Sequence, residues 1–315
     1  MLRRVSLAIV GLGALWIGSL AQAQSVLVLW GDSVVCGFGA DACTSTPYGP
    51  SPFGDPIPDA WRWDEAGQRW IELTPLQNHQ GTGADPAYGV AAGWRAMHRS
   101  SGPLFVVALG IPGADVTPMM SRNHASWSPN VAGSAFHRFV SRSLRPALAS
   151  LAAPRVELVC GSAGNNVVPD WSQFQSDLGA TWEGLLAQLP NAPRTLMLRS
   201  YCALNVNSRS AIDASGYVVV NLDQLPARTD GLQRDGVHLT HYGNVCAGAR
   251  VAVTAALVPL PSAPSAVEGE GANVTAGPAP LGPGGKSQGP LSALKHKEPA
   301  KRALSVSTAA LSQQH

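Results

Sequence analysis

The sequence predicts an α/β protein built as a three-layer sandwich around a mostly parallel sheet. Short, continuous apolar runs rich in β-branched residues recur along the chain, and runs of this length are typical of strands buried on both faces. Stretches with helical patterning lie between consecutive runs, and this alternation of strand and helix indicates parallel pairing. A composition with 45% hydrophobic and only 13% charged residues fits a folded globular protein.

The predicted strands follow from the apolar runs in chain order. Three runs are strong and two near the end are weaker: 25–30, 104–109 and 156–160, then 195–199 and 217–222. The segment 61–70 contains three tryptophans and predicts a β-hairpin whose turn lies at 64–68. The helical stretches between the runs cover 89–100, 136–152, 173–188 and 242–257. Open sheets of this kind bind ligands outside the carboxyl ends of their strands, so the loops after the strands are the candidate site.

The two ends of the chain are expected to lie outside the folded domain. Residues 1–23 have the features of a secretory signal peptide: Arg3 and Arg4, an apolar run over 7–20, and small residues at Ala21 and Ala23. The alternative is a membrane anchor, but the run is short for a span of ~20 residues. We therefore predict a secreted or periplasmic protein without stable membrane insertion.

The segment 259–315 is rich in proline and glycine and contains no Phe, Trp or Tyr. Such a composition cannot bury enough apolar surface to offset chain entropy, so we predict a disordered tail and one domain over 24–258. Between residues 21 and 258 the chain carries 15 basic and 17 acidic residues. This balance argues against nucleic-acid binding. No C-x-x-C pair and no metal-like histidine spacing occur, so no metal site is expected.

Four loops after the predicted strands carry groups suited to acyl transfer. Ser33 follows the first strand in Gly31-Asp32-Ser33, and the second is followed by a glycine-rich turn over 110–115. Asn165 and Asn166 follow the third strand. Asp235 and His238 precede the last helix, and this spacing suits a carboxylate that orients a histidine base. Together the loops offer a nucleophile, a backbone donor, an amide donor and a base with its orienting acid.

This order of blocks resembles the SGNH/GDSL hydrolases. The blocks are G-D-S-x-x-x-G at 31–37, G-x-x-G at 110–113, the asparagine block and the late D-x-x-H. Within that superfamily the segments 70–75, 88–94 and 235–240 are similar to the sialate O-acetylesterase-like branch of carbohydrate esterases. The chain departs from that branch with A-G-N-N-V in the third block and G-D-S-V-V in the first.

The resemblance implies a flavodoxin-like sandwich, no cofactor and hydrolysis of acyl esters. It gives Ser33 the role of nucleophile, His238 that of general base and Asp235 that of third triad member. The oxyanion hole would combine the Ser33 and Gly113 backbone N–H groups, with Gly110 as the weaker alternative to Gly113. It would be completed by the side-chain amide of Asn165 or Asn166, a choice that the sequence leaves open.

Three other residues have two interpretations each. Asp115 either lines the pocket or belongs to a surface loop. Trp61 and Trp63 either stack on sugar rings of a substrate or pack the hairpin onto the domain. Asp32 is expected to hydrogen-bond the turn, and His241 to lie in the first turn of the last helix.

The sequence thus predicts a secreted serine esterase that removes acyl groups, above all O-acetyl groups, from a small-molecule or glycan ester. A lipolytic GDSL-type esterase acting on short acyl chains is the nearest alternative. A non-catalytic glycan-binding protein on the same fold is the alternative outside the enzymes.

Overall fold

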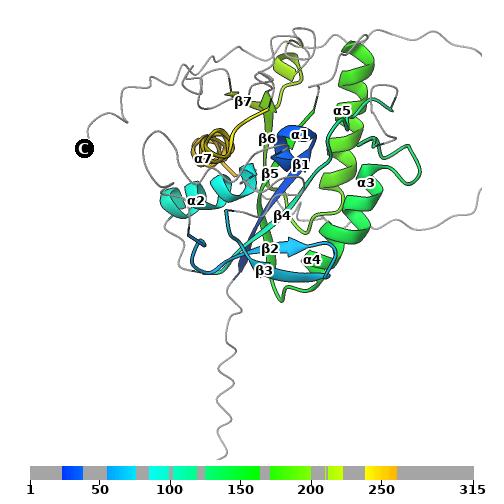
Figure 1. Cartoon of the computed structure of the whole chain (residues 1–315). Helices are drawn as coiled ribbons and strands as arrows, with labels where there is room; N and C mark the ends of the chain where they lie inside the picture. The colour runs from blue at the N-terminus through cyan, green and yellow to red at the C-terminus, as the bar shows by residue number, and fades with distance from the viewer. Residues whose placement is uncertain are drawn as a thin grey trace, which may run out of the picture. The chain divides into compact units, whose positions relative to one another are not determined.

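A central sheet of seven strands organises the protein in the computed structural model (Figure 1). The structure describes residues 23–37, 55–75, 85–98, 102–118, 125–163, 171–199, 210, 212–222 and 238–260. The strands are β1 (Gln24–Gly31), β2 (Ala60–Asp64), β3 (Arg69–Glu72), β4 (Leu104–Gly110), β5 (Pro154–Ser162), β6 (Arg194–Arg199) and β7 (Val218–Asn221). The five predicted strands and the predicted hairpin are all confirmed.

The strand order is β3-β2-β4-β1-β5-β6-β7. Every neighbouring pair is parallel except β2 and β3, which form the antiparallel hairpin. Leaving the hairpin aside, the order corresponds to 2-1-3-4-5, which is that of flavodoxin-like sheets. The chain after β1 thus adds β4 on one side of β1 and then β5 on the other. The carboxyl end of β1 therefore lies at the topological switch point of the sheet.

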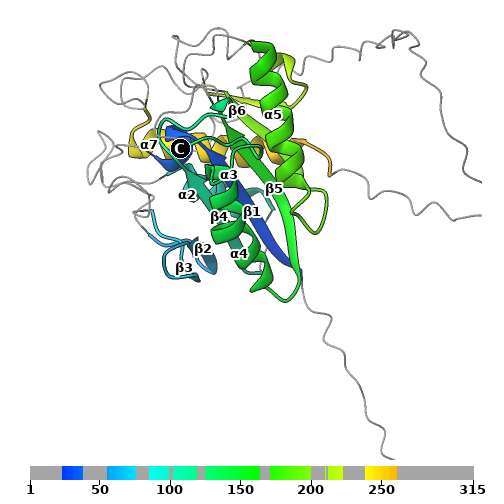
Figure 2. The same ribbon diagram turned by 90° about the vertical axis from the view of Figure 1, so that its right-hand side faces the viewer.

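Helices cover both faces of the sheet, which makes three layers (Figures 1 and 2). Their bounds are α1 (Ser33–Cys36), α2 (Pro86–His98), α3 (Ala135–Arg138), the π-helical turn η3 (Phe139–Leu144), α4 (Arg145–Ala149), α5 (Trp171–Leu186) and α7 (His241–Leu257). The helices α2 and α7 cover one face, whereas α5 and the continuous segment from α3 to α4 cover the other. Among the described residues, no helix is both long and apolar enough to cross a membrane.

The helix α2 begins three residues earlier than its apolar pattern predicts, because its start is fixed by a cap. The Asp85 carboxylate accepts a hydrogen bond from the Ala87 backbone N–H at 3.0 Å. Pro86 occupies the first helical position, where its fixed φ and missing N–H cost nothing. Asp followed by Pro is a start signal that the periodicity alone does not contain.

The hairpin is held on the domain by the π-helical turn. The Arg142 carbonyl in η3 accepts one hydrogen bond from the Trp63 indole at 3.1 Å and one from the Gln68 side-chain amide at 2.8 Å. The Trp63 ring also packs edge-on against Trp70, with centroids 5.2 Å apart. The hairpin is therefore docked by its tryptophans against the helical layer.

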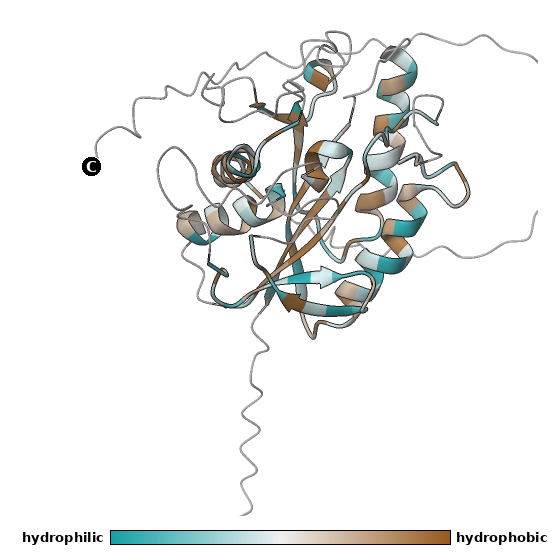
Figure 3. Cartoon of the chain, in the orientation of Figure 1, coloured by the Kyte–Doolittle hydropathy of each residue, from teal (hydrophilic) through white to brown (hydrophobic). Residues whose placement is uncertain are grey.

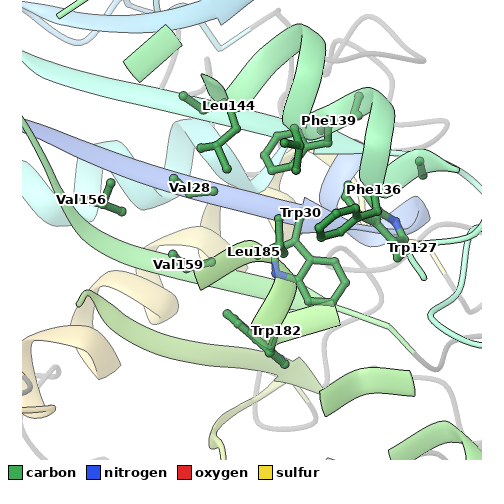
Figure 4. Packing of buried hydrophobic residues seen from close by; sticks show 14 of the residues in the cluster. Val28, Trp30, Trp127, Phe136, Phe139, Leu144, Val156, Val159, Trp182 and Leu185 are labelled. Atoms are coloured by element: carbon green, nitrogen blue, oxygen red, sulfur yellow. The ribbon is translucent and has the colours of Figure 1, made fainter. Parts of the chain in front are cut away.

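Two hydrophobic cores lie on the two faces of the sheet, and the central strands are hydrophobic along most of their length (Figure 3). The core under α3, η3, α4 and α5 contains large aromatic side chains: Trp30, Trp127, Trp182, Phe136, Phe139 and Phe174 (Figure 4). The core under α2 and α7 consists mainly of Ala, Val and Leu. A Cβ on Gly248 would lie 2.1 Å from the Pro86 carbonyl oxygen, so α2 and α7 approach at backbone contact.

Candidate active site

Ser33 lies where β1 ends and the short helix α1 begins. Gly31, the last residue of β1, has a φ of 152°, and a Cβ there would lie 2.3 Å from the Ser162 carbonyl oxygen. Asp32 is the N-cap of α1, and its carboxylate accepts a hydrogen bond from the Val34 N–H at 3.0 Å. Asp32 therefore has the structural role in the turn that the sequence predicts for it.

The turn formed by residues 31–33, called the Ser33 turn below, is held by segments that are distant in sequence. The Gly31 carbonyl accepts hydrogen bonds from the Ile111 backbone N–H and from the Trp127 indole, both at 2.9 Å. The Ser162 hydroxyl donates to the Asp32 carboxylate at 3.1 Å. The ends of β4, β1 and β5 and the segment around Trp127 thus meet at the switch point, which is where open α/β sheets carry their sites.

The two glycines after β4 lie in different surroundings. Gly110 is packed under α1, since a Cβ there would lie 2.2 Å from the Cys36 backbone nitrogen. Gly113 has a φ of 73°, in the left-handed region that suits glycine, and is partly exposed at the tip of a turn that the Ala114 N–H closes on the Ile111 carbonyl at 3.0 Å. This difference favours Gly113 over Gly110 as a backbone donor to a ligand.

His238 lies just before the last helix and is partly exposed. Thr240 caps α7 by accepting a hydrogen bond from the Gly243 N–H at 3.1 Å. The neighbouring Leu239 is buried in the same hydrophobic cluster as Val34 and Val35, which follow Ser33. One cluster therefore anchors both the segment that carries His238 and the helix that begins at Ser33.

Three predicted site residues fall outside the described part of the chain. Asp235 precedes the described segment 238–260, and Asn165 and Asn166 follow the last residue of the described segment 125–163. The strand before the asparagines ends at Ser162, beside the Ser33 turn. The roles of these three residues stay predictions.

Asp115 is fully buried, so it does not belong to a surface loop. Its carboxylate accepts a hydrogen bond from the Val116 N–H at 2.7 Å, and its carbonyl accepts one from the Trp127 N–H at 2.8 Å. The prediction that Asp115 lies in a surface loop is therefore wrong. Its carbonyl instead bonds to Trp127, whose indole donates to the Gly31 carbonyl. A substrate contact by Asp115 stays a prediction.

The two hairpin tryptophans differ in exposure. Trp63 is buried, with 5% of its surface exposed, whereas Trp61 is 36% exposed and donates to the Asp59 carboxylate at 3.3 Å. The burial of Trp63 therefore favours a role in packing the hairpin onto the domain over stacking on a sugar. Trp61 pairs with Phe105, five positions before Gly110 on β4, which corresponds to about 16 Å along the strand. Trp61 thus lies well away from the Ser33 turn.

His241 is the first residue of α7, as predicted, and is buried. Burial lowers its pKa below the ordinary value, because a buried site disfavours the charged imidazolium. Within the described residues, no group of three or more His, Cys, Asp or Glu side chains is placed to hold a metal ion.

Two residues of the site, Trp127 and Ser162, were missed by the sequence reasoning. Ser162 lies in the block Gly161-Ser162-Ala163 directly after the third apolar run, and this spacing is the signal that places it at the sheet edge. Trp127 lies 96 residues from the carbonyl that its indole contacts, and no local pattern indicates such a contact.

Comparison with known proteins shows similarity at the level of structure. No protein-family model matches the sequence, and no curated protein matches it significantly. A crystal structure of an Arabidopsis thaliana protein is similar with a TM-score of 0.56 and 16% identity, covering 74% of this chain and 98% of the other. This likeness supports the α/β fold described above.

Two further similar structures come from bacteria. One is assigned to the G-D-S-L family of lipolytic proteins, from Desulfitobacterium hafniense, with a TM-score of 0.40, 11% identity and coverage of 73% and 98%. The other is the acetylxylan esterase Axe2 of Geobacillus stearothermophilus, with a TM-score of 0.38, 12% identity and coverage of 74% and 93%. The narrower resemblance to sialate O-acetylesterases stays a prediction.

Proposed function

We propose that the protein is a serine ester hydrolase with Ser33 as its nucleophile. The observation that carries the proposal is the Ser33 turn itself: a serine at the first position of a helix, directly after the central strand and at the switch point of a flavodoxin-like sheet. A serine fixed in this way is suited to nucleophilic catalysis when a base lies nearby. His238 is the candidate base, because the D-x-x-H block of the sequence points to it and it lies just before the last helix, α7.

The proposed reaction proceeds through an acyl-enzyme. The Ser33 hydroxyl attacks the ester carbonyl while His238 takes its proton, and the oxyanion is held by the Ser33 and Gly113 N–H groups with the amide of Asn165 or Asn166. The bond to the alcohol then breaks, and His238 gives its proton to the leaving oxygen. Water, deprotonated by His238, attacks the acyl carbonyl; the bond to the Ser33 oxygen breaks, His238 returns its proton to that oxygen, and the carboxylic acid leaves. Asp235 would orient His238 and stabilise the imidazolium.

We further propose that the substrate is an O-acetyl ester on a carbohydrate and that the protein acts after export. The substrate assignment is supported by the sequence blocks at 70–75, 88–94 and 235–240. Export is supported by the signal-like segment 1–23. Short-chain lipid-like esters are the alternative substrates of the same chemistry.

The test is acetate or acyl release with the wild-type protein and two serine variants. Ser33→Ala removes the nucleophile, and we expect kcat to fall by at least about 10³-fold, as is typical when a triad serine is removed. Ser141→Ala is the matched control, because Ser141 is an exposed serine of η3 whose hydroxyl donates to the His137 carbonyl. This control should retain full activity.

The substrates would be acetylated xylan, O-acetyl sialic acid and a p-nitrophenyl ester series from acetate to decanoate. If acetate is released from a glycan and this release depends on Ser33, the carbohydrate assignment is supported. Activity confined to the simple esters and rising with chain length would replace it by a lipolytic function. Equal rates for Ser33→Ala and wild type, or no turnover on any substrate, would contradict the hydrolase proposal and favour a glycan-binding protein.

A further inference from the structure

A buried hydrogen bond joins β5 to the turn that carries Ser33. The Ser162 hydroxyl donates to Oδ1 of Asp32 at 3.1 Å across 130 residues of sequence. Both side chains are buried, each with 1% of its surface exposed. A hydrogen bond in such low-dielectric surroundings is stronger than an ordinary surface contact.

The same carboxylate oxygen also caps the helix that begins at Ser33. Oδ1 of Asp32 accepts from the Val34 N–H at 3.0 Å in addition to the Ser162 hydroxyl. The helix α1 is only four residues long, and a helix of one turn has no stability of its own. Asp32 is therefore one of the groups that hold the start of α1 at Ser33, and Ser162 donates to the same carboxylate oxygen that caps the helix.

The surroundings of Ser162 explain why a small hydroxyl side chain stands there. Ser162 is the last residue of β5 and pairs with Gly31 in the register of the sheet. A Cβ on Gly31 would lie 2.9 Å from the Ser162 Cβ, so the two strands leave little room between them at this point. Serine provides a donor in the smallest side chain that can reach Asp32.

We propose that Ser162 is a positioning residue of the active site: through Asp32 it fixes the cap of α1 and with it the direction of the Ser33 hydroxyl. This inference rests on the proposed function, because it assumes that Ser33 is the nucleophile. Ser162 itself is buried and contacts Asp32, so it is not assigned a contact with substrate. Its loss should lower kcat and leave KM nearly unchanged.

A double-mutant cycle separates positioning from a loss of packing. Ser162→Ala removes a single oxygen, and we expect kcat to fall about 10- to 100-fold, the range for leaving a buried polar group without its hydrogen bond or displacing a reacting atom. Asp32→Asn keeps an oxygen acceptor, and Asp32→Ala removes it. Ser162→Ala should lower kcat in the Asp32→Asn background and change it less than about 2-fold in the Asp32→Ala background. Equal reductions in both backgrounds would overturn the proposal.

Ser143→Ala is the matched control. Ser143 is buried to a similar degree, with 2% exposed, and its hydroxyl also donates to a carboxylate, Glu65, at 3.3 Å. That pair lies between η3 and the hairpin, away from the Ser33 turn. Ser143→Ala should retain the wild-type kcat. A drop equal to that of Ser162→Ala would show that any lost buried hydroxyl has the effect, and would contradict positioning.

Amide hydrogen exchange provides a measurement that does not depend on turnover. The Val34 N–H is bonded to Asp32, so Ser162→Ala should speed its exchange about 10-fold or more, whereas Ser143→Ala should not. Unchanged exchange in Ser162→Ala overturns the positioning role, whatever the activity is. If the wild type has no Ser33-dependent turnover, the proposed function fails, and the exchange result still decides whether Ser162 holds the turn.

Discussion

The two faces of the sheet are closed in different ways. On the face covered by α5, large rings fill the space: Trp30 lies 5.2 Å from Trp127 and 5.4 Å from Trp182 between ring centroids. On the face covered by α2 and α7, glycines and alanines bring the two helices into backbone contact. Below, these are called the aromatic face and the small-residue face.

The difference has a consequence for the site. β1 contributes to both faces in alternation, with Val28 and Trp30 in the aromatic core and Leu27 and Leu29 in the other. The aromatic face also supplies a polar group to the Ser33 turn, because the Trp127 indole donates to the Gly31 carbonyl. The small-residue face holds α7, whose start follows His238. The two faces thus position different parts of the candidate site.

The largest effect is expected from truncation on the aromatic face. Trp182 is 1% exposed and packs edge-on against Trp30, so Trp182→Ala leaves a large cavity. We expect the free energy of unfolding to fall by about 3–5 kcal/mol, measured by chemical denaturation. Trp61→Ala is the control, because Trp61 is 36% exposed and its removal should cost less than about 1 kcal/mol. Similar losses for both variants would show that the aromatic face is loosely packed.

Enlargement should be harmful where α2 and α7 meet and harmless at a glycine of α5 that has open space around it. Gly248→Ala places a Cβ 2.1 Å from the Pro86 carbonyl oxygen, whereas a Cβ on Gly179 of α5 has nothing within 4 Å. We expect Gly248→Ala to lower the free energy of unfolding by about 2–3 kcal/mol. Gly179→Ala should raise it by about 0.5–1 kcal/mol through helix propensity. The opposite signs, read from denaturation curves, test the comparison; a Gly248→Ala protein as stable as wild type would refute it.

The smallest effect is a pH dependence on the small-residue face. Burial lowers the pKa of His241 from its ordinary 6.5, so the unfolded chain takes up this proton at a higher pH than the folded protein does. Stability is therefore lost as the pH falls below about 6.5. We expect His241→Gln to flatten the pH dependence of the free energy of unfolding between about pH 7.5 and 5.5. Identical slopes in the variant and the wild type would mean that His241 does not titrate differently on folding.

The sequence was sufficient for the elements of the fold, because each element has a local pattern. The runs that became β1, β4 and β5 are continuously apolar, since both of their faces are buried. The hairpin at 60–72 follows from alternating tryptophans around a polar turn. The predicted start of α2 was three residues too late, because Asp85 caps the helix before its apolar pattern begins. Local patterns also mark where strands and helices end, so the sequence could place Ser33, Gly113 and His238 in the loops at these ends.

The tertiary structure alone decided what holds the Ser33 turn and how the two faces differ. The contacts of Trp127 with Gly31 and of Ser162 with Asp32 span 96 and 130 residues, and the buried Asp115 pairs with Ser126 in an isolated bridge. Propensity and periodicity describe interactions between residues close in sequence. Which distant side chain completes a buried hydrogen bond depends on the order of the strands in the sheet, which no single segment encodes.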